Sequence, residues 1–295
     1  MIRPLDKDPR PFRSFLFAPC RSVSLLTRGF NSGADVVIPD LEDSLEGPVA
    51  KDQGLQVLLR FLEGLTEGGP LVIPRLNDLS SPSMLTKLET LARAQVNGFL
   101  IPKVNTADDL QTVDEQLGNL EKAHGFHAGQ FSLWALIETP KGVSNLSRIA
   151  QATPRLQGLV FGSEDLLSYM HASHLLPLEF LRSVAVDLVI RCRANDLIAV
   201  DTVHLDRSSL EGVGRRAAYS SSLGFDGMLA IHPEQIAPIN ANFPSDDDRN
   251  WAARVLDSAG GNSRQETGVF QKGSMIIGPP MLRSARRIDL ESRDL

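Results

Sequence analysis

The sequence has few of the features that mark secreted, membrane or nucleic-acid-binding proteins. Its 295 residues include only two cysteines, Cys20 and Cys192, which provide no disulfide framework and fit a reducing compartment. No apolar run approaches the length of a membrane span, and the first residues lack a signal-peptide core, so we expect a cytoplasmic protein without a membrane partner. A net charge of −6 argues against a nucleic-acid partner or an anionic membrane.

Common catalytic and cofactor motifs are absent as well. The sequence has no phosphate-binding loop, no Gly-rich dinucleotide fingerprint after its first apolar run, no zinc-ligand spacing, and no Ser/His/Asp or Cys/His arrangement. Because the net charge is negative, an anionic substrate must be met by a few local Arg or Lys side chains. The composition, with 42% hydrophobic and 22% charged residues, is that of a soluble globular protein.

Eight short apolar runs alternate with helical patterns along most of the chain. Apolar runs without polar alternation predict strands that are buried on both faces, as in a parallel sheet covered by helices. The predicted strands are 14–19, 35–40, 71–76, 98–103, 131–138, 158–162, 197–203 and 227–232. The predicted helices are 24–32, 51–65, 83–94, 107–124, 143–152, 179–195, 210–223 and 247–259. This alternation favours a (β/α)8 TIM barrel over an open doubly wound sheet, which usually has fewer strands.

The chain divides into a barrel and a C-terminal extension. We expect residues 1–243 to form the barrel and to carry the active site, and residues 244–295 to form a helix, a linker and a final segment. The linker, 260–268, is rich in Gly, Ser and Asn. The apolar tail that follows, 269–282, needs a surface on which to bury its side chains.

Ionisable residues stand at the ends of most of the predicted strands. In a TIM barrel, the C-terminal ends of the strands form the active face. The residues found there are Pro19, Asp40 with Glu42 and Asp43, Arg75, Lys103, Glu138, Ser163 to Asp165, Asp201 and His232. Random loop polarity would place Ser, Asn and Gly there at least as often, so the pattern favours a catalytic face.

Glu138 and Asp165 follow two neighbouring apolar runs. An ionised carboxylate in a buried place is costly unless a cation, hydrogen bonds or solvent compensate its charge. Two such carboxylates at adjacent strand ends suggest a divalent metal with oxygen ligands, and magnesium fits best. The structural alternative is that both residues cap helices or form loop salt bridges.

Two cations complete the predicted face. The planar fork of Arg75 suits a substrate carboxylate held by two hydrogen bonds, although a salt bridge to Asp40 or Glu42 would use the same donors. Lys103 is a candidate for binding an anionic group of the substrate, or for pairing with a neighbouring acid.

The remaining candidates concern the cofactor and the general base. Arg21, in the first loop, is a candidate for binding an anionic cofactor tail, and His232 lies on the same rim. The general base is open, and the local candidates are Asp40, Glu42 and His232.

An ordered set of short motifs spans most of residues 13–259. They are RSFLFAP at 13–19, DVVIPDLED at 35–43 with Lys51, PRLN at 74–77, IPK at 101–103, IET at 137–139, FGSEDL at 161–166, LGFDG at 223–227, AIHPEQ at 230–235 and FPS at 243–245. No single motif is specific, but this ordered set is. On these motifs the chain resembles the citrate lyase beta-subunit-like branch of the HpcH/HpaI aldolase family.

The resemblance implies a (β/α)8 barrel that uses magnesium to cleave or form a carbon–carbon bond in a 3-hydroxyacyl thioester. By motif match, Glu138 and Asp165 would be the metal ligands and Arg75 would bind the substrate carboxylate. The substrates would be citryl, malyl or citramalyl thioesters, carried by coenzyme A or by an acyl carrier protein. Related subunits form homotrimers or hexamers in which the C-terminal segment acts as a lid on a neighbour's site.

The sequence departs from the family's pattern at three places. Cys20 stands where the family has Gly, which would crowd the approach of a cofactor. After Lys51, the expected pair of a small residue and Arg reads Gly54-Leu55. Ile277 stands where the lid carries an Asp, and an aliphatic side chain cannot transfer a proton.

These departures keep two other functions open. One is an aldolase that acts on free pyruvate or oxaloacetate without a thioester. The other is a barrel that binds a metal and a ligand with little turnover.

Overall fold

A computed structural model of the chain describes residues 12–65, 68–81, 83–94, 96–173, 179–259, 268–272 and 275–293. Its strands are β1 Ser14–Pro19, β2 Val36–Asp40, β3 Leu71–Val72, β4 Gly98–Ile101, β5 Ser132–Ile137, β6 Leu156–Phe161, β7 Ile198–Asp201, β8 Gly227–Ala230, β9 Phe270–Lys272 and β10 Met275–Ile277. Its α-helices are α1 Val23–Phe30, α2 Gly47–Glu63, α3 Met84–Arg93, α4 Ala107–His124, α5 Pro140–Ser144, α6 Leu146–Ile149, α7 Ser163–Tyr169, α8 Glu179–Ala194, α9 Leu210–Leu223, α10 Ile236–Asn240, α11 Asp246–Ala259 and α12 Pro279–Arg293. A 3₁₀ helix, η2, spans Pro233–Gln235.

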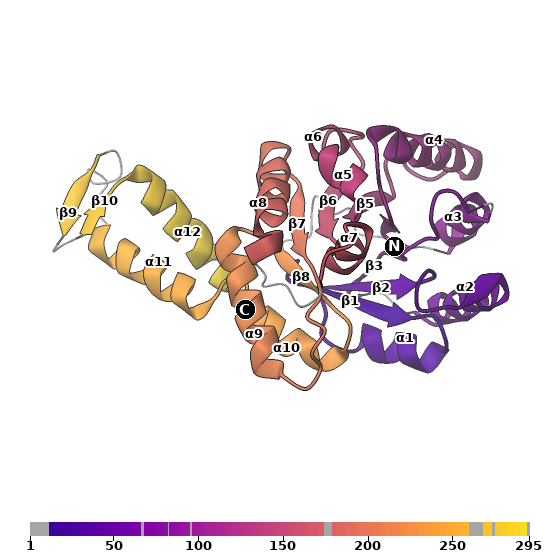
Figure 1. Ribbon diagram of the computed structural model, residues 1–295, viewed down its shortest axis with the longest axis horizontal. Helices are drawn as coiled ribbons and strands as arrows, with labels where there is room; N and C mark the ends of the chain where they lie inside the picture. Colours follow the sequence, from indigo (N-terminus) through magenta and orange to yellow (C-terminus); the bar gives the residue numbers. More distant parts are fainter. Residues whose placement is uncertain are drawn as a thin grey trace.

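Strands β1 to β8 form one parallel sheet in the order β3-β2-β1-β8-β7-β6-β5-β4. This order is that of a barrel, because sequential strands are neighbours and β1 pairs with β8. The helices lie outside the strands (Figure 1). The predicted TIM barrel is therefore confirmed, and the C-terminal strand ends meet at one mouth.

The strands are buried on both faces, as their uninterrupted apolar runs predict. One set of side chains fills the barrel interior, and includes Phe15, Ile38, Leu100, Trp134 and Val200. The alternate side chains pack against the helices. Gly158 makes room for the largest interior residue, because a β-carbon at Gly158 would lie 2.6 Å from the Trp134 ring.

The barrel closes between its third and fourth strands through a short seam at Arg75. The predicted strand 71–76 is regular only at Leu71–Val72 because Pro74 has no N–H to donate to a ladder. The backbone of Arg75 instead forms single bridges to Asp40 on one side and to Leu100 on the other. The Leu76 N–H donates to the Leu100 carbonyl at 3.1 Å, and the Leu100 N–H donates to the Pro74 carbonyl at 3.0 Å.

Several elements differ from the predicted ones. The single helix expected at 143–152 is two short helices, α5 and α6, which meet at Asn145. The Asn145 amide donates to the Asn105 and Lys141 carbonyls, a competition with helix bonding that is typical of Asn. Helix α7, which directly follows β6, was not predicted. The predicted linker, 260–268, lies almost entirely outside the described residues.

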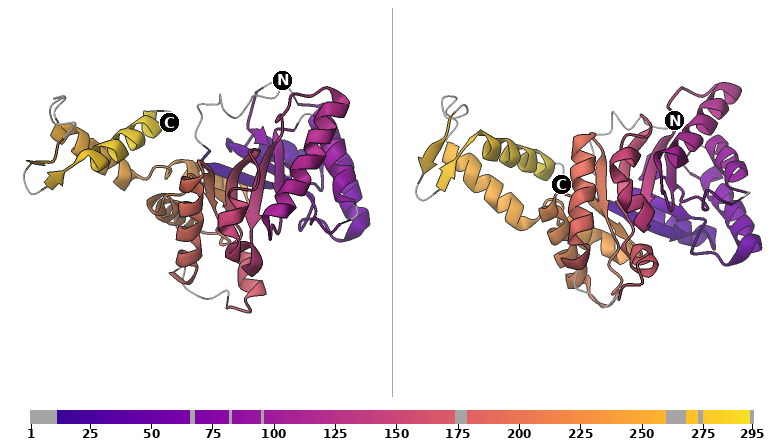
Figure 2. Two further views of the ribbon diagram at one scale, coloured as in Figure 1. Left: turned by 90° about the horizontal axis from the view of Figure 1, so that it is seen from above. Right: turned by 45° about the horizontal axis from the view of Figure 1, so that its top comes forward.

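The C-terminal segment forms an arm with a core of its own. Helices α11 and α12 pack against each other, and β9 and β10 form an antiparallel hairpin between them, away from the barrel (Figures 1 and 2). The buried arm residues are Ala252, Val255, Ile277, Leu282, Ala285 and Ile288. The apolar tail thus buries part of its side chains on α11 of the same chain. No described helix is both long and apolar enough to cross a membrane.

Candidate active site

Arg75 and Asp40 form a buried ion pair with two parallel hydrogen bonds at the barrel mouth. Arg75 Nε donates to Asp40 Oδ1 and Arg75 Nη2 donates to Asp40 Oδ2, both at 2.8 Å. The same carboxylate accepts the N–H groups of Glu42 at 3.0 Å and of Ser44 at 2.9 Å. Burial opposes ionisation, but the charge and hydrogen bonds of Arg75 outweigh it and hold the pKa of Asp40 below its ordinary value.

The remaining Arg75 donor serves two further acids. Its Nη1 lies 2.9 Å from Asp43 Oδ2 and 3.1 Å from Glu42 Oε2. The guanidinium also lies over the Phe17 ring, 4.8 Å from its centroid. All three nitrogens of the guanidinium therefore face acids of the β2–α2 loop, which is the salt bridge that the sequence left open as the alternative role of this residue.

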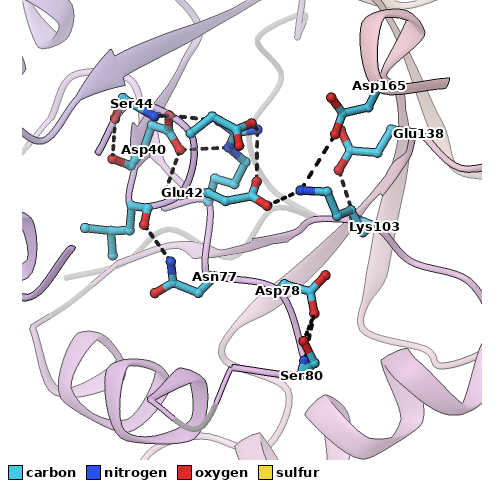
Figure 3. A network of polar contacts seen from close by, with 12 residues as sticks. Asp40, Glu42, Ser44, Asn77, Asp78, Ser80, Lys103, Glu138 and Asp165 are labelled. Atoms are coloured by element: carbon cyan, nitrogen blue, oxygen red, sulfur yellow. Dashed lines mark hydrogen bonds and ion pairs between the residues drawn. The ribbon is translucent and has the colours of Figure 1, made fainter. Parts of the chain in front are cut away.

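Lys103 connects this acidic loop to the next part of the mouth. Its Nζ donates to Glu42 Oε1 at 2.5 Å and lies 3.7 Å from Asp165 Oδ2 (Figure 3). Burial raises the pKa of Glu42 above its ordinary value, even though Arg75 and Lys103 favour its ionised form. Glu42 is thus a buried acid between two cations.

Glu138 lies at the end of β5 and is almost fully buried, with 4% of its surface exposed. Its Oε1 accepts the backbone N–H of Lys103 at 2.9 Å. Burial, with the nearby negative charges of Glu42 and Asp165, raises the pKa of Glu138 to about 8, against the opposing effect of Arg75. The ionised form of Glu138 therefore has too little positive charge nearby to offset its burial.

Asp165 faces the same space from the first turn of α7 (Figure 3). Its side chain is 39% exposed, so it meets solvent where Glu138 does not. Acids in a first turn are favoured by the helix dipole. The run Ser163-Glu164-Asp165 therefore contained a signal for α7 that strand-based reasoning missed.

Glu138 and Asp165 together fit a magnesium ion. Both offer oxygen ligands, and magnesium is usually bound by one or two carboxylates, with water and substrate completing its shell. No group of three or more His, Cys, Asp or Glu side chains suited to a metal occurs among the described residues. The donor set therefore does not fit a metal that needs an all-protein cage.

The other predicted residues lie around this mouth without joining the acidic network. Arg21 Nε donates to the Ser44 carbonyl at 2.9 Å and ties the first loop to the second. His232 caps η2, where its Nδ1 accepts the Glu234 N–H at 3.4 Å. Asp201 points outward to Arg216 on α9 and is fully buried, so it belongs to the packing of the barrel.

Cys20 does not project into the mouth. Its side chain is 1% exposed and packs in the layer between strands and helices, where burial raises the pKa of the thiol above its ordinary value. The nearby Gly54 on α2 makes room for Leu45, because a β-carbon at Gly54 would overlap the Leu45 side chain.

Ile277 is a core residue of the arm. It is fully buried among side chains of α11 and α12. In this structure it does not face the acidic network of its own barrel, which lies away from the arm (Figure 1).

The family is decided by comparison with known proteins. Residues 13–233 match the model of the HpcH/HpaI aldolase/citrate lyase family. The chain belongs to this family. It is therefore a carbon–carbon lyase by family, as the sequence motifs predict.

Individual members of the HpcH/HpaI family align over nearly the whole chain. Citrate lyase subunit beta of Escherichia coli K12 is 29% identical over 96% of this chain and 94% of its own length. A (3S)-malyl-CoA thioesterase of Cereibacter sphaeroides is 32% identical over 94% of this chain and 93% of its own. Both relatives are enzymes of acyl-thioester or citrate metabolism by name, so the alignment places the chain among CoA-ester lyases and their relatives.

The fold agrees with a solved member of the same family. The crystal structure of CitE from Mycobacterium tuberculosis in complex with magnesium, acetoacetate and coenzyme A superposes with a TM-score of 0.77. It is 26% identical and covers 96% of this chain and 98% of its own. The barrel and the C-terminal arm thus both have counterparts in that structure.

Proposed function

We propose that the chain is a magnesium-dependent lyase that cleaves a small 3-hydroxy-dicarboxylic thioester into an acetyl thioester and a 2-oxo acid. The observation that carries this proposal is the buried, charge-deficient Glu138 beside Asp165 at the barrel mouth. Citramalyl, malyl and citryl thioesters are the substrates that this chemistry fits. Glu138 and Asp165 would hold the ion, which supplies Lewis-acid polarisation of the hydroxyl and of the forming carbonyl.

Arg75 and Lys103 are the cations that would meet the substrate carboxylate. Lys103 lies beside Asp165 and Arg75 lies on the far side of Glu42, and the donors of both are engaged by Asp40 and Glu42 in this structure. A substrate carboxylate would therefore exchange places with an acid of the loop, or add to the edge of the guanidinium. Asp40 then acts as a positioning residue that fixes the plane of Arg75.

Glu42 is the strongest candidate for the general base among the three residues named from the sequence. Asp40 is a poor base because both its oxygens accept hydrogen bonds and its pKa is lowered. His232 caps η2 and has no contact with the acidic network among the described residues. Glu42 is buried beside Arg75 and has a raised pKa, which is what a base working near neutral pH needs.

The reaction would move one proton and one electron pair. Glu42 takes the proton of the 3-hydroxyl, the C–O bond becomes a carbonyl, and the bond between C2 and C3 breaks. The electron pair of that bond passes to the acetyl fragment as an enolate of the thioester, which takes up one proton from solvent while Glu42 releases the hydroxyl proton to solvent. The remaining fragment is the 2-oxo acid, with its carboxylate still held by Arg75.

The thioester reading is favoured over an aldolase that acts on free oxo acids. Cys20 packs between the strands and the helices, and Arg21 is exposed on the first loop, where it could meet an anionic carrier. The named relatives act on citrate or malyl thioesters, and the solved relative holds coenzyme A together with magnesium.

The arm would cover the site of a neighbouring copy. It leads away from its own barrel, and Val269 and Ile276 on it are 71% and 65% exposed. Residues 244–295 would thus be a separate lid segment, and the working unit a homotrimer or hexamer. Light scattering on the full chain, with and without residues 269–295, tests this assembly.

The function itself is tested by measuring two products from one reaction. Citramalyl-, malyl- and citryl-CoA are offered with magnesium or with EDTA, and 2-oxo acid and free thiol are both quantified. Lyase activity gives 2-oxo acid without free thiol and is lost with EDTA. Free thiol without 2-oxo acid would indicate ester hydrolysis, and no product from any ester would favour a binding protein with little turnover.

A further inference from the structure

Lys103 has an unusual backbone conformation for a residue with a side chain. Its φ is 51°, in the left-handed region that costs non-glycine residues energy. This conformation lets one residue meet two acids, because the N–H of Lys103 points to Glu138 while its ammonium points to Glu42. The strained backbone of Lys103 therefore places the ammonium beside Glu42 while its N–H holds Glu138.

Asn105 holds this conformation in place. Its Nδ2 donates to the Lys103 carbonyl at 2.8 Å, and its Oδ1 accepts the hydroxyl of Thr139 at 2.6 Å. Thr139 follows Glu138 directly and caps α5. The β4–α4 loop, which carries the ammonium, is thus fastened to the strand end that carries Glu138.

The charges around Lys103 do not balance. Among the residues that the structure describes, the acidic side chains of Asp40, Glu42, Asp43 and Asp165 have ion pairs with two cations, Arg75 and Lys103, and a fifth acid, Glu138, accepts the backbone N–H of Lys103. Arg75 is directed to the acids of the β2–α2 loop. The Lys103 ammonium is therefore the cation nearest to Asp165, at 3.7 Å.

We propose that Lys103 is an internal counter-cation that competes with a divalent ion for the carboxylates of this mouth. Without the ion, its ammonium pairs with Glu42 and lies close to Asp165, so it offsets the negative charge of these two acids. With the ion, the two like charges repel, so Lys103 limits the affinity of the site and keeps the ion exchangeable. This inference rests on the metal site of the proposed function.

The test compares magnesium binding by calorimetry in the full-length wild type and in Lys103→Met. Loss of one positive charge a few ångströms from a divalent ion should tighten binding by about tenfold. Lys103→Arg keeps the charge and should stay close to the wild type. Lys141→Met removes an equal charge from the exposed surface of α5 and controls for net charge.

A second measurement checks the metal-free protein. Lys103→Met should melt at a lower temperature than the wild type in EDTA, and magnesium should raise its melting temperature by the larger increment. Equal or weaker magnesium binding by Lys103→Met overturns the inference while leaving the metal site intact. A wild type that binds no magnesium overturns both the inference and the proposed function.

Discussion

Gly162 lies directly against Glu138. A β-carbon at Gly162 would stand 2.6 Å from the β-carbon of Glu138 and 3.0 Å from its Oε2. Real β-carbons do not approach this closely, so any side chain at the end of β6 must displace the carboxylate at the end of β5. The glycine thus determines where the carboxylate stands.

Gly162→Ala should therefore disturb the proposed metal site by displacing Glu138, without replacing either proposed ligand. We expect magnesium affinity to fall by about 10- to 100-fold, as for other changes that misplace a metal ligand, while the barrel stays folded. Calorimetry with magnesium measures the effect. Gly118→Ala on α4 is the control, because its new β-carbon meets only Arg155 Nη2 at 3.8 Å, and its magnesium affinity should not change.

The raised pKa of Glu138, about 8, predicts a pH dependence of stability in the metal-free protein. Folded protein keeps the proton up to that pH, whereas the unfolded chain releases it near the ordinary value of 4.5. Between these two values the folded state binds more protons, so the free energy of unfolding should fall as pH rises. Glu138→Gln should lack this part of the fall.

Thermal unfolding in EDTA at several pH values from 5 to 8 compares the two proteins. The melting temperature of Glu138→Gln should rise relative to the wild type toward pH 8. Curves that stay parallel throughout would show that Glu138 is already ionised in the folded protein.

Arg75→Met should destabilise the barrel more than a surface change would. It leaves Asp40 buried without its counter-ion and leaves Glu42 with Lys103 alone, a loss of about 3–5 kcal/mol in the free energy of unfolding. Denaturant unfolding measures it. Arg215→Met breaks an exposed pair with Glu211 on α9 and should cost no more than about 0.5 kcal/mol. Similar losses in both variants would mean that the Arg75 network contributes little.

Restoring an acid at position 277 should harm the arm. Ile277→Asp places a carboxylate among the apolar side chains of Val255, Leu282 and Ala285, and we expect helices α11 and α12 to become sensitive to protease while the barrel resists. Ile277→Val should cost about 0.5–1.5 kcal/mol and leave the arm resistant. An Ile277→Asp arm that stays protected would show that the side chain can turn toward solvent or a neighbour.

The barrel was predictable because its strands are short, uninterrupted apolar runs. Uninterrupted apolar runs such as that of β5 admit few structures other than a strand buried on both faces, and their number and spacing select a barrel. The shortened β3 was less predictable, since Pro74 interrupts the ladder while the surrounding residues remain buried.

The clustering of the candidate site residues was predictable, but the ion pairs between them were not. Strand ends brought Asp40, Arg75, Lys103 and Glu138 together, as a barrel must. The sequence does not show which acid accepts the two parallel hydrogen bonds of Arg75, because this depends on distances in the folded barrel. The hydrogen bond from Thr139 to Asn105 joins residues 34 positions apart, and no sequence motif indicated it.

The seam at Arg75 gives the barrel a mechanical property. Arg75 is the bridge residue between β2 and β4, and its side chain pairs with Asp40 at the mouth. A motion that widens the seam between β3 and β4 must carry the guanidinium with it. Opening of the barrel and rearrangement of its charges are therefore a single movement, and hydrogen exchange at Leu76 and Leu100 would report on both.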